Sequence, residues 1–257
     1  MNIIITAGGT SEKIDPVRKI TNTSTGLLAS KIYNALVEVI HGHHNPIHID
    51  YVAAKNAQLP KIKSPHQLYS VTDTQSVDQI LSELFTSKKI DIMIHCMAVS
   101  DYYVSRIQTE TQLATELLDL VEQKNTASQE VQLDDVLTIL RNNSYHQLDK
   151  CNKIVSSESL YLRLSETPKL IEKVKKISPN TRLIGFKLLH NAPEEYLLQT
   201  ANMMALTSRC ELVVANNLTS IHGENHEAFI IKNGKVIDTC FTKEEIANSL
   251  KDYLFST

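Results

Sequence analysis

Residues 1–26 read MNIIITAGGTSEKIDPVRKITNTSTG, and their pattern decides the fold class. The three consecutive isoleucines from Ile3 to Ile5 predict a strand that is buried on both faces, as in parallel sheets. The small residues that follow, Thr6 to Thr10, would let a ligand approach the backbone at the carboxyl end of this strand. The polar run from Thr21 to Gly26 leads into an apolar helix, whose free N–H groups suit an anion, above all a phosphate.

The glycine turn at Gly8 and Gly9 is a weak signal by itself, because many α/β proteins have such a turn. It has no third glycine at the spacing of the dinucleotide-binding fingerprint GxGxxG. It does not match the phosphate-binding loop GxxxxGK[ST] either. The two glycines therefore indicate a close approach to the backbone and leave the ligand open.

The composition is that of an ordinary globular chain. Its 257 residues are enough for one large domain, and 42% are hydrophobic and 21% charged. A formal net charge of -3 argues against nucleic acid as a partner. No apolar run approaches the length of a membrane span, and Met1 leads straight into a strand without a signal peptide, so we expect a cytoplasmic protein. The four cysteines have no metal-binding spacing and are expected as reduced thiols.

Apolar periodicity predicts alternating helices and strands in the first hundred residues. These are a helix at Leu27–Ile40, a strand at Ile47–Ala54, a helix at Asp73–Phe85 and a strand at Ile90–Cys96. This order predicts an α/β fold with a doubly wound, mainly parallel, Rossmann-like sheet and right-handed crossovers.

The second half continues the alternation after a more polar stretch at 105–149, which we interpret as a helical insertion with a solvated hairpin. The predicted elements are a strand at Leu160–Leu164, a helix from Thr167, a strand at Leu183–Leu188, a helix at Glu194–Ser208 and a strand at Glu211–Asn217. The dipeptide Asn233-Gly234 predicts a β-hairpin with a type I′ turn. A final helix at Thr242–Leu254 has Thr242 and Glu245 at capping-box spacing.

The string ITAGGTSEKIDPVRKITNTSTG resembles the opening of the phosphopantothenoylcysteine synthetases, whose pattern is roughly TAGGTxExIDPVRxIxNxSSG. The stretches MAVSDY, NKIVSS, GFKL and VVAN resemble later motifs of that family. The resemblance runs from residue 2 to about residue 240, apart from the insertion. Met97 departs from it, since the family usually has alanine there.

The resemblance implies a ligase that joins 4′-phosphopantothenate to L-cysteine in coenzyme A biosynthesis through an acyl-nucleotide intermediate. It implies Mg²⁺, a nucleotide triphosphate for which we favour CTP over ATP, and a homodimer. We interpret residues 1–257 as a single ligase domain in a monofunctional form. The flavin-dependent decarboxylase of the pathway is then expected on a separate polypeptide.

The same resemblance implies roles for particular residues. The catalytic residues are Asn22, Asp101 and Lys153, with Asp101 also holding the metal. The nucleotide-binding residues are Gly8, Ser24, Gly26, Phe186, Asn216, Arg163 and Lys150, and the substrate-binding residues are Arg18, Asn22 and Ala98. Residues 150–164 are expected to form a lid over the triphosphate, although Lys150 and Lys153 taken alone favour a solvated surface.

Two other functions share this fold class. An NAD(P)-binding oxidoreductase would need the GxGxxG turn and an acidic residue at the end of the second strand, where Val52 to Ala54 stand and Asp50 comes too early. A non-catalytic nucleotide-binding module would lose Asn22, Asp101 or the lysines, and the chain has all of them. No combination of serine, histidine and aspartate indicates a side-chain nucleophile. The chain offers a phosphate-binding turn, one carboxylate for a divalent cation, polar amides and basic residues. This set suits transfer of a nucleotidyl group, in which the protein positions its substrates and neutralises their charge.

Overall fold

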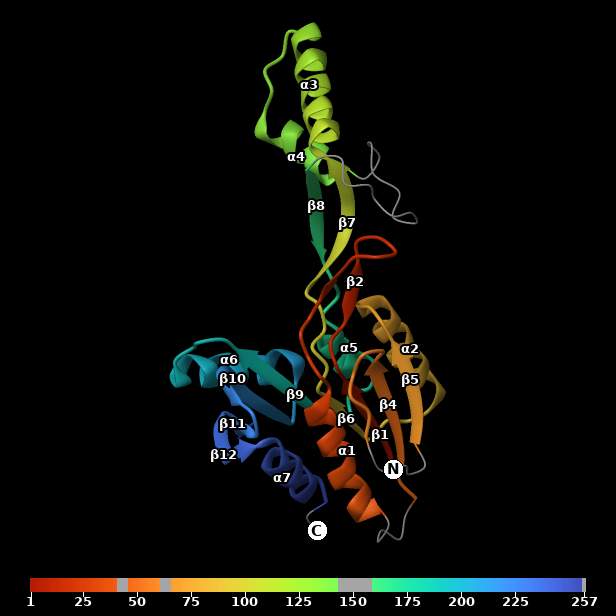
Figure 1. Cartoon of the computed structure of the whole chain (residues 1–257), viewed down its shortest axis with the longest axis vertical. Coiled ribbons are helices and arrows are strands. Elements are labelled where there is room, and N and C mark those ends of the chain that lie inside the picture. The colour runs from red at the N-terminus through yellow and green to blue at the C-terminus, as the bar shows by residue number, and fades with distance from the viewer. Residues whose placement is uncertain (41–45, 61–65, 143–158, 256–257) are drawn as a thin grey trace. The chain divides into compact units, whose positions relative to one another are not determined.

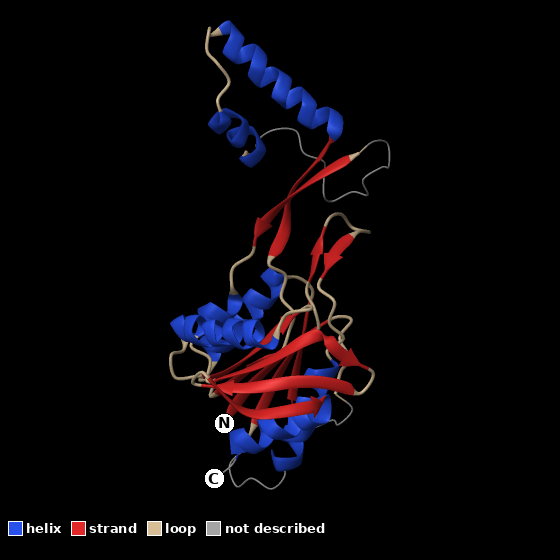
Figure 2. Ribbon diagram, turned by 90° about the vertical axis from the view of Figure 1, so that its left-hand side faces the viewer, coloured by secondary structure: helices blue, strands red, loops and turns tan. Residues whose placement is uncertain are grey.

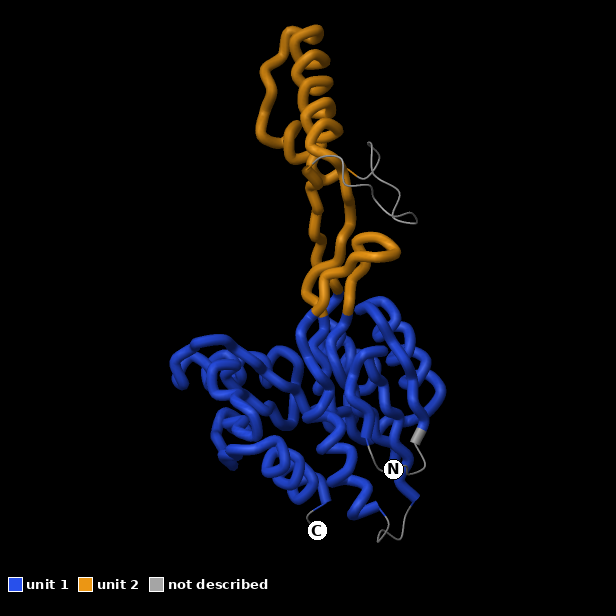
Figure 3. Tube along the Cα trace, in the orientation of Figure 1, with its two compact units in different colours: residues 1–10, 22–99, 168–257 blue, residues 11–21, 100–167 orange. Residues whose placement is uncertain are grey.

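The computed structural model describes residues 1–40, 46–60, 66–142 and 159–255 (Figure 1). The chain forms two compact units, each built from separate stretches of sequence (Figure 3). The sheet unit comprises Met1–Thr10, Asn22–Val99 and Pro168–Thr257. The insertion unit comprises Ser11–Thr21 and Ser100–Thr167.

The sheet unit is organised around an 8-stranded sheet with the order β12-β11-β10-β9-β6-β1-β4-β5. Its parallel part consists of β1 (Asn2–Ala7), β4 (His48–Ala54), β5 (His66–Val71), β6 (Ile92–His95), β9 (Arg182–Leu189) and β10 (Leu212–His222). Counted along the chain, these strands lie in the order 3-2-1-4-5-6, which is that of dinucleotide-binding folds. The chain reverses its direction across the sheet between β1 and β6. The predicted Rossmann-like sheet is therefore confirmed.

Helices cover both faces of the sheet (Figure 2). One face packs against α1 (Leu27–Ile40) and α7 (Lys243–Phe255). The other packs against α2 (Thr74–Ser87), α5 (Leu170–Ile177) and α6 (Glu194–Ser208). Alternate residues of β1 divide between these two cores, with Ile3 and Ile5 on the α1 side and Ile4 on the α2 side, and all three side chains are fully buried. The run of isoleucines thus has the two-sided burial that its sequence predicts.

An antiparallel hairpin extends the sheet beyond β10. It consists of β11 (Asn225–Lys232) and β12 (Lys235–Thr242). Asn233 and Gly234 have φ angles of 49° and 77°, as the predicted type I′ turn requires. At the start of α7, the Thr242 hydroxyl accepts from the Glu245 N–H at 3.1 Å, as the predicted capping box requires. The Glu245 carboxylate accepts from the Phe241 N–H at 2.7 Å, and not from the N–H of Thr242 as in a standard capping box.

The insertion unit contains two antiparallel strand pairs and two described helices. One pair is β2 (Ser11–Lys13) with β3 (Lys19–Thr21), and the other is β7 (Tyr102–Thr109) with β8 (Leu160–Glu166). The helices α3 (Glu110–Thr126) and α4 (Leu133–Arg141) fall inside the polar stretch at 105–149. A buried ion pair joins Arg106 of β7 to Glu116 of α3, and Arg106 also donates to the Ile139 carbonyl in α4 at 3.1 Å. The buried Arg106 side chain thus joins β7 to both helices of the hairpin that the sequence indicates.

Several features of the fold differ from what periodicity indicates. The predicted helix from Thr167 begins instead at Leu170, with Lys169 as its N-cap. Thr167 does not cap it, because its hydroxyl donates to the Ser100 carbonyl and its N–H donates to the Asp101 carbonyl. Apolar periodicity also predicts no strand at β5 (His66–Val71), because its residues from Gln67 to Ser70 are exposed or half-buried. Within the described ranges, no helix is both long enough and apolar enough to cross a membrane.

At Gly9, two backbone segments of the sheet unit lie against each other. It forms a parallel bridge with Ala98, and the Asn22 N–H donates to the Thr10 carbonyl at 3.0 Å. A Cβ atom at position 9 would lie 2.0 Å from the Asn22 carbonyl oxygen. Because this oxygen belongs to the backbone, no rotation of a side chain could relieve the clash.

We therefore expect Gly9→Ala to lower the free energy of unfolding by about 3 kcal/mol, near the upper end for an overpacked core position. Urea denaturation would measure the loss. Gly223→Ala is the matched control, because its added Cβ would meet nothing within 4 Å and only the left-handed φ of 60° would be strained. That strain alone amounts to about 1 kcal/mol. Equal losses in the two variants would contradict the close approach at Gly9.

Candidate functional site

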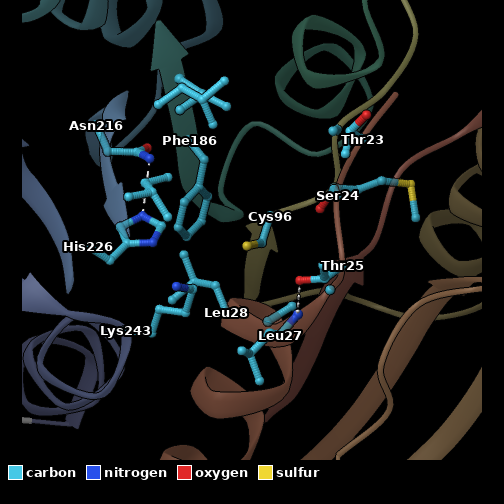
Figure 4. A pocket seen from close by; sticks show the side chains of 17 residues that line it. Thr23, Ser24, Thr25, Leu27, Leu28, Cys96, Phe186, Asn216, His226 and Lys243 are labelled. Atoms are coloured by element: carbon cyan, nitrogen blue, oxygen red, sulfur yellow. Dashed lines mark hydrogen bonds between the residues drawn. The ribbon is translucent and has the colours of Figure 1, made fainter. Parts of the chain in front are cut away.

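A cavity of about 300 Å³ lies in the sheet unit at the carboxyl ends of β6, β9 and β10 (Figure 4). Its walls come from the segment Thr23–Ala29 at the start of α1, from Cys96–Ala98 after β6, and from side chains of β9, β10, β11 and α7. Open α/β sheets bind their ligands at this edge, where the strand order reverses. The volume is at the lower end of the range for small-molecule sites.

One side of the cavity is polar and begins at the amino end of α1. Thr23, Ser24 and Thr25 lie here, followed by Gly26 with a φ of 76°. The Thr25 hydroxyl accepts from the Leu27 N–H at 3.3 Å. The first N–H groups of an α-helix have no partner inside the helix, and the helix dipole places partial positive charge at this end. This side of the cavity therefore suits a phosphate group.

The opposite side of the cavity is apolar, with one hydrogen-bonded pair set into it. Phe186 and Leu188 of β9 form part of this wall. Asn216 of β10 and His226 of β11 are both buried, and the Asn216 amide nitrogen lies 3.1 Å from His226 Nε2. Burial, with a smaller contribution from the nearby charge of Lys243, lowers the pKa of His226 to about 4. An aromatic ring beside a few directed polar groups is typical of sites for flat heterocycles.

The loop after β6 is held by a buried hydroxyl. Thr6 Oγ1 of β1 accepts from the Met97 N–H at 3.1 Å and lies 3.1 Å from His95 Nδ1. Gly8 and Thr10 each add one backbone hydrogen bond to Ala98. The Gly8 carbonyl accepts from the Ala98 N–H at 2.9 Å, and the Thr10 N–H donates to the Ala98 carbonyl at 3.1 Å. These bonds fix the stretch from Cys96 to Ala98 that lines the cavity.

The structure brings five of the residues implied by the resemblance to this cavity. They are Ser24, Gly26, Ala98, Phe186 and Asn216. Gly8 lies directly behind them, since its nitrogen is 3.3 Å from where a Cβ atom of Gly26 would stand. Its φ of 86° and the nearby Cβ atoms of Ala54 and Ala57 exclude a larger residue at position 8.

Asn22 also belongs to the sheet unit but does not line the cavity. Its amide nitrogen donates to the Val99 carbonyl at 3.0 Å. This bond joins the segment before α1 to the segment after β6 and fixes the orientation of the amide. Asn22 therefore has a structural contact of its own within the sheet unit.

Arg18, Asp101 and Arg163 belong to the insertion unit. Arg18 Nε and Nη2 donate to the buried Asp15 carboxylate at 2.9 and 2.6 Å, which fixes the turn that Pro16 begins. Arg163 donates to the carbonyls of Leu140 and Arg141 at the end of α4. It lines a second cavity of about 300 Å³ within the insertion unit, and not the one at the sheet edge.

Two residues expected to contact the triphosphate, Lys150 and Lys153, lie outside the described residues, as does most of the expected lid at 150–164. The end of that range, Leu160 to Leu164, belongs to β8.

The carboxylates of the described residues limit what kind of Mg²⁺ site the chain can form. No cluster of three or more His, Cys, Asp or Glu side chains that could hold a metal ion occurs in the described part of the chain. Asp101 is exposed. Mg²⁺ that accompanies a nucleotide takes most of its ligands from phosphates and water, and needs only one or two carboxylates from the protein. Asp101 therefore fits a metal that arrives with its nucleotide, and not a closed protein cage.

Sequence reasoning missed His226 and Lys243 as residues of the cavity. His226 occupies one position in an unremarkable strand, and Lys243 is the first residue of α7. Only the pairing of β10 with β11 and the packing of α7 beside α1 bring them to the sheet edge. No local pattern in the sequence carries that information.

The sheet order and the cavity define a Rossmann-like α/β protein with a cavity at the amino end of α1. The chain belongs to the family described as the DNA/pantothenate metabolism flavoprotein C-terminal domain, which it matches over residues 1–134 and 141–256. The structure of the DNA/pantothenate metabolism flavoprotein from Streptococcus pneumoniae is similar to it, with a TM-score of 0.77 and 30% identity over 100% of this chain and 99% of that chain.

Two further proteins are similar to the chain. It is 29% identical to the coenzyme A biosynthesis bifunctional protein CoaBC of Thermococcus kodakarensis, over 97% of this chain and 50% of that protein. The chain thus spans about half the length of this relative. A mutant of Cab2 in complex with phosphopantothenate-cysteine shares the fold, with a TM-score of 0.63, 15% identity, and coverage of 99% of this chain and 87% of that chain.

The buried histidine beside Thr6 makes stability depend on pH. Burial lowers the pKa of His95 to about 4, whereas an unfolded chain has the ordinary value near 6.5. Between these values the unfolded state binds more protons, so stability rises with pH and is lost as the pH falls from about 6.5 to about 4. At about 1.4 kcal/mol for each pKa unit, His95 contributes roughly 3 kcal/mol to this difference at most.

We expect His95→Gln to lose part of this dependence while keeping a partner for the Thr6 hydroxyl. Urea denaturation at pH 7.5 and pH 4.5 would measure it, with the wild-type chain compared at both values. An unchanged difference between the two pH values would show that His95 is accessible to protons in the folded state.

Proposed function

We propose that the protein is a phosphopantothenate–cysteine ligase of coenzyme A biosynthesis. The observation that carries the proposal is the cavity at the sheet edge, which combines a helix amino end for phosphates with an aromatic and amide wall for a base. Family membership supports it, and so does the fold shared with Cab2, whose complex contains phosphopantothenate-cysteine.

The proposed reaction has two steps. The carboxylate of 4′-phosphopantothenate attacks the α-phosphorus of the nucleotide triphosphate, pyrophosphate leaves, and an acyl-nucleotide forms. The cysteine amine then attacks the acyl carbon and loses its proton, the nucleoside monophosphate leaves, and the new amide bond remains. Neither step needs a side-chain nucleophile, so the protein acts by positioning its substrates and by neutralising charge.

Each part of the cavity has a proposed task in this reaction. The amino end of α1, with Ser24 and Gly26, would hold the phosphates, and Phe186 and Asn216 would hold the base and ribose. Asn22, with its amide oriented by the Val99 carbonyl, would hydrogen-bond the reacting acyl group. Ala98 would contact the substrate, because its small side chain leaves space beside the strand end.

Asp101 and Arg18 are proposed for the charged groups of the substrates. Asp101 follows the cavity residue Ala98 by three positions and would hold Mg²⁺, which offsets charge developing on the phosphates. Arg18 would bind the phosphate of phosphopantothenate in a bidentate manner, since Asp15 already fixes the side chain that presents its guanidinium. We propose a homodimer in which Arg18 serves the neighbouring subunit, and sedimentation velocity would measure the mass.

We propose CTP as the nucleotide, with ATP as the alternative. An oxidoreductase that uses NAD(P) is not favoured, because Asp50, the acidic residue of the second parallel strand, is occupied by a buried ion pair. Asp50 is fully buried within β4 and pairs with Lys88 at 2.8 Å, so it cannot reach a ribose at the strand end.

The direct test is product formation. Purified protein with Mg²⁺, 4′-phosphopantothenate, cysteine and either CTP or ATP is expected to release pyrophosphate and to form phosphopantothenoylcysteine, which mass spectrometry would detect. Omitting cysteine should leave the acyl-nucleotide as the last product. Absence of product with both nucleotides would refute the proposal.

Asn22 and Asp101 are expected to differ in which step they affect. Asn22→Ala should reduce ligation at least about a hundredfold while nucleotide affinity changes little, because the contact to the acyl group strengthens during reaction. Asp101→Asn should instead weaken binding of the Mg²⁺–nucleotide complex by removing a charge from the cation. Calorimetry with CTP and Mg²⁺ separates the two outcomes. Thermal denaturation of Asn22→Ala is the control, because loss of the bond to Val99 also affects stability. Equal losses of CTP affinity in both variants would refute this division of roles.

A further inference from the structure

A second cavity lies inside the insertion unit, and the proposed reaction assigns no step to it. Its volume is about 300 Å³, the same as that of the cavity at the sheet edge. All of its described lining residues belong to β7, β8, α3 and α4 (Figure 1). The insertion unit therefore has space for a small molecule of its own.

The floor of this cavity is one face of the antiparallel ribbon formed by β7 and β8. Arg106 lies opposite Arg163 in this ribbon, and Gln108 lies opposite Tyr161. Residues two apart on a strand point to the same side, and directly opposed residues of antiparallel strands share that side. These four side chains therefore form one polar face. Ile107 lies on the other face, where it is fully buried in a separate apolar cluster.

The helices α3 and α4 cover this polar face. Arg106 and Gln108 are only 2% and 4% exposed. Arg106 pairs with Glu116 of α3 and donates to the Ile139 carbonyl of α4, while Arg163 donates to the last carbonyls of α4. Both arginines thus hold the helices over the ribbon. Because burying an ion pair adds little to stability, a cover that leaves a cavity above these groups is not explained by stability alone.

Arg141 brings a charge to the cavity that these structural contacts do not use. It is the last residue of α4, and its side chain has no hydrogen bond or ion pair with any residue in the described part of the chain. No acidic residue is among the described residues that line the cavity. The cavity therefore favours an anion, and a guanidinium binds carboxylate and phosphate groups through two parallel hydrogen bonds.

The rest of the wall suits an apolar group. Leu113 of α3 and Leu140 of α4 line the cavity, and Tyr161 adds an aromatic ring that is 48% exposed. Walls of this kind hold the body of a ligand, while a few polar groups fix its orientation. Inorganic phosphate alone would leave them uncovered, so an organic anion fits the cavity better.

We propose that this cavity binds a small organic anion, with its carboxylate or phosphate group on Arg141 and its apolar body against Leu113, Leu140 and Tyr161. The inference goes beyond the proposed ligase reaction, because it gives the insertion unit a ligand of its own. Its floor is the face that carries Arg106 and Arg163, which adds positive charge around the anionic group.

Calorimetric titration of the whole chain with three probes that share one apolar body tests the proposal. Phenylbutyrate carries a carboxylate, phenylbutyl phosphate carries a phosphate, and phenylbutanol is the neutral control. We expect at least one of the two anions to bind at millimolar concentration or below, and at least about tenfold more tightly than phenylbutanol. The anion that binds more tightly identifies the class of ligand.

Arg141→Gln should weaken the preferred anion at least about tenfold, because one charge-assisted contact is lost. Lys19→Gln is the matched control. Lys19 is an exposed residue of the same unit that does not line the cavity, so its loss removes the same charge and should leave the affinity unchanged.

Tyr161→Trp reports where the anion binds. The chain contains no tryptophan, so the emission of this variant comes from the cavity wall alone. We expect the emission to change with the preferred anion, and much less with phenylbutanol at the same concentration. Phe186→Ala alters the cavity at the sheet edge and should bind the anion as the wild type does.

Absence of binding by both anions would overturn the proposal, and so would equal binding of phenylbutanol or full affinity in Arg141→Gln. Loss of affinity in Phe186→Ala, with unchanged emission from Tyr161→Trp, would place the anion at the sheet edge and overturn it as well. If Arg141→Gln does not fold, the emission of Tyr161→Trp decides. The ligase reaction is tested separately by its product, so either proposal can fail alone.

Discussion

The missing side chain at Gly9 is the constraint on which the candidate site depends. The Asn22 carbonyl occupies the space where a Cβ atom would stand, so the segment leading into α1 can lie directly against the end of β1. Asn22 then donates to the Val99 carbonyl and connects that segment to the chain after β6. The amino end of α1 and the loop from Cys96 to Ala98 form two walls of one cavity because these backbone segments are in contact. A larger residue at position 9 would separate the walls before any ligand was involved.

The two sides of the cavity have different physical origins. The polar side depends on backbone geometry, namely the start of α1 after a glycine with a positive φ. The other side depends on side chains brought together by strand pairing, with the neutral imidazole of His226 held between an amide and the apolar wall. A backbone site of the first kind tolerates changes of side chain, whereas a side-chain site of the second kind is sensitive to single substitutions. Differences in ligand preference among relatives are therefore expected on the β10–β11 side.

The sequence predicted those parts of the fold that local periodicity controls. The isoleucines of β1 and the apolar stripe of α1 indicated both elements, and the predicted bounds of α6 agree with the structure. The edge strand β5 was missed because most of its side chains face solvent and leave no alternation to detect. In the site, Ser24 and Phe186 were identified by resemblance and do line the cavity, although their roles remain predictions. His226 could not be found, since its position depends on a shift in register between two strands distant from the first motif.

The chain leaves the sheet unit twice, and each departure is closed at its base by hydrogen bonds. The first closes between the Thr10 carbonyl and the Asn22 N–H, and the second between the Asp101 carbonyl and the Thr167 N–H. Once the ends of a loop are fixed, doubling the length of the loop raises the entropic free-energy cost of closing it by only about 0.6 kcal/mol. Evolution can therefore lengthen, shorten or replace the stretch between α3 and β8 with little effect on the stability of the sheet. The insertion unit is where members of this family can diverge in size while the arrangement of the strand ends stays the same.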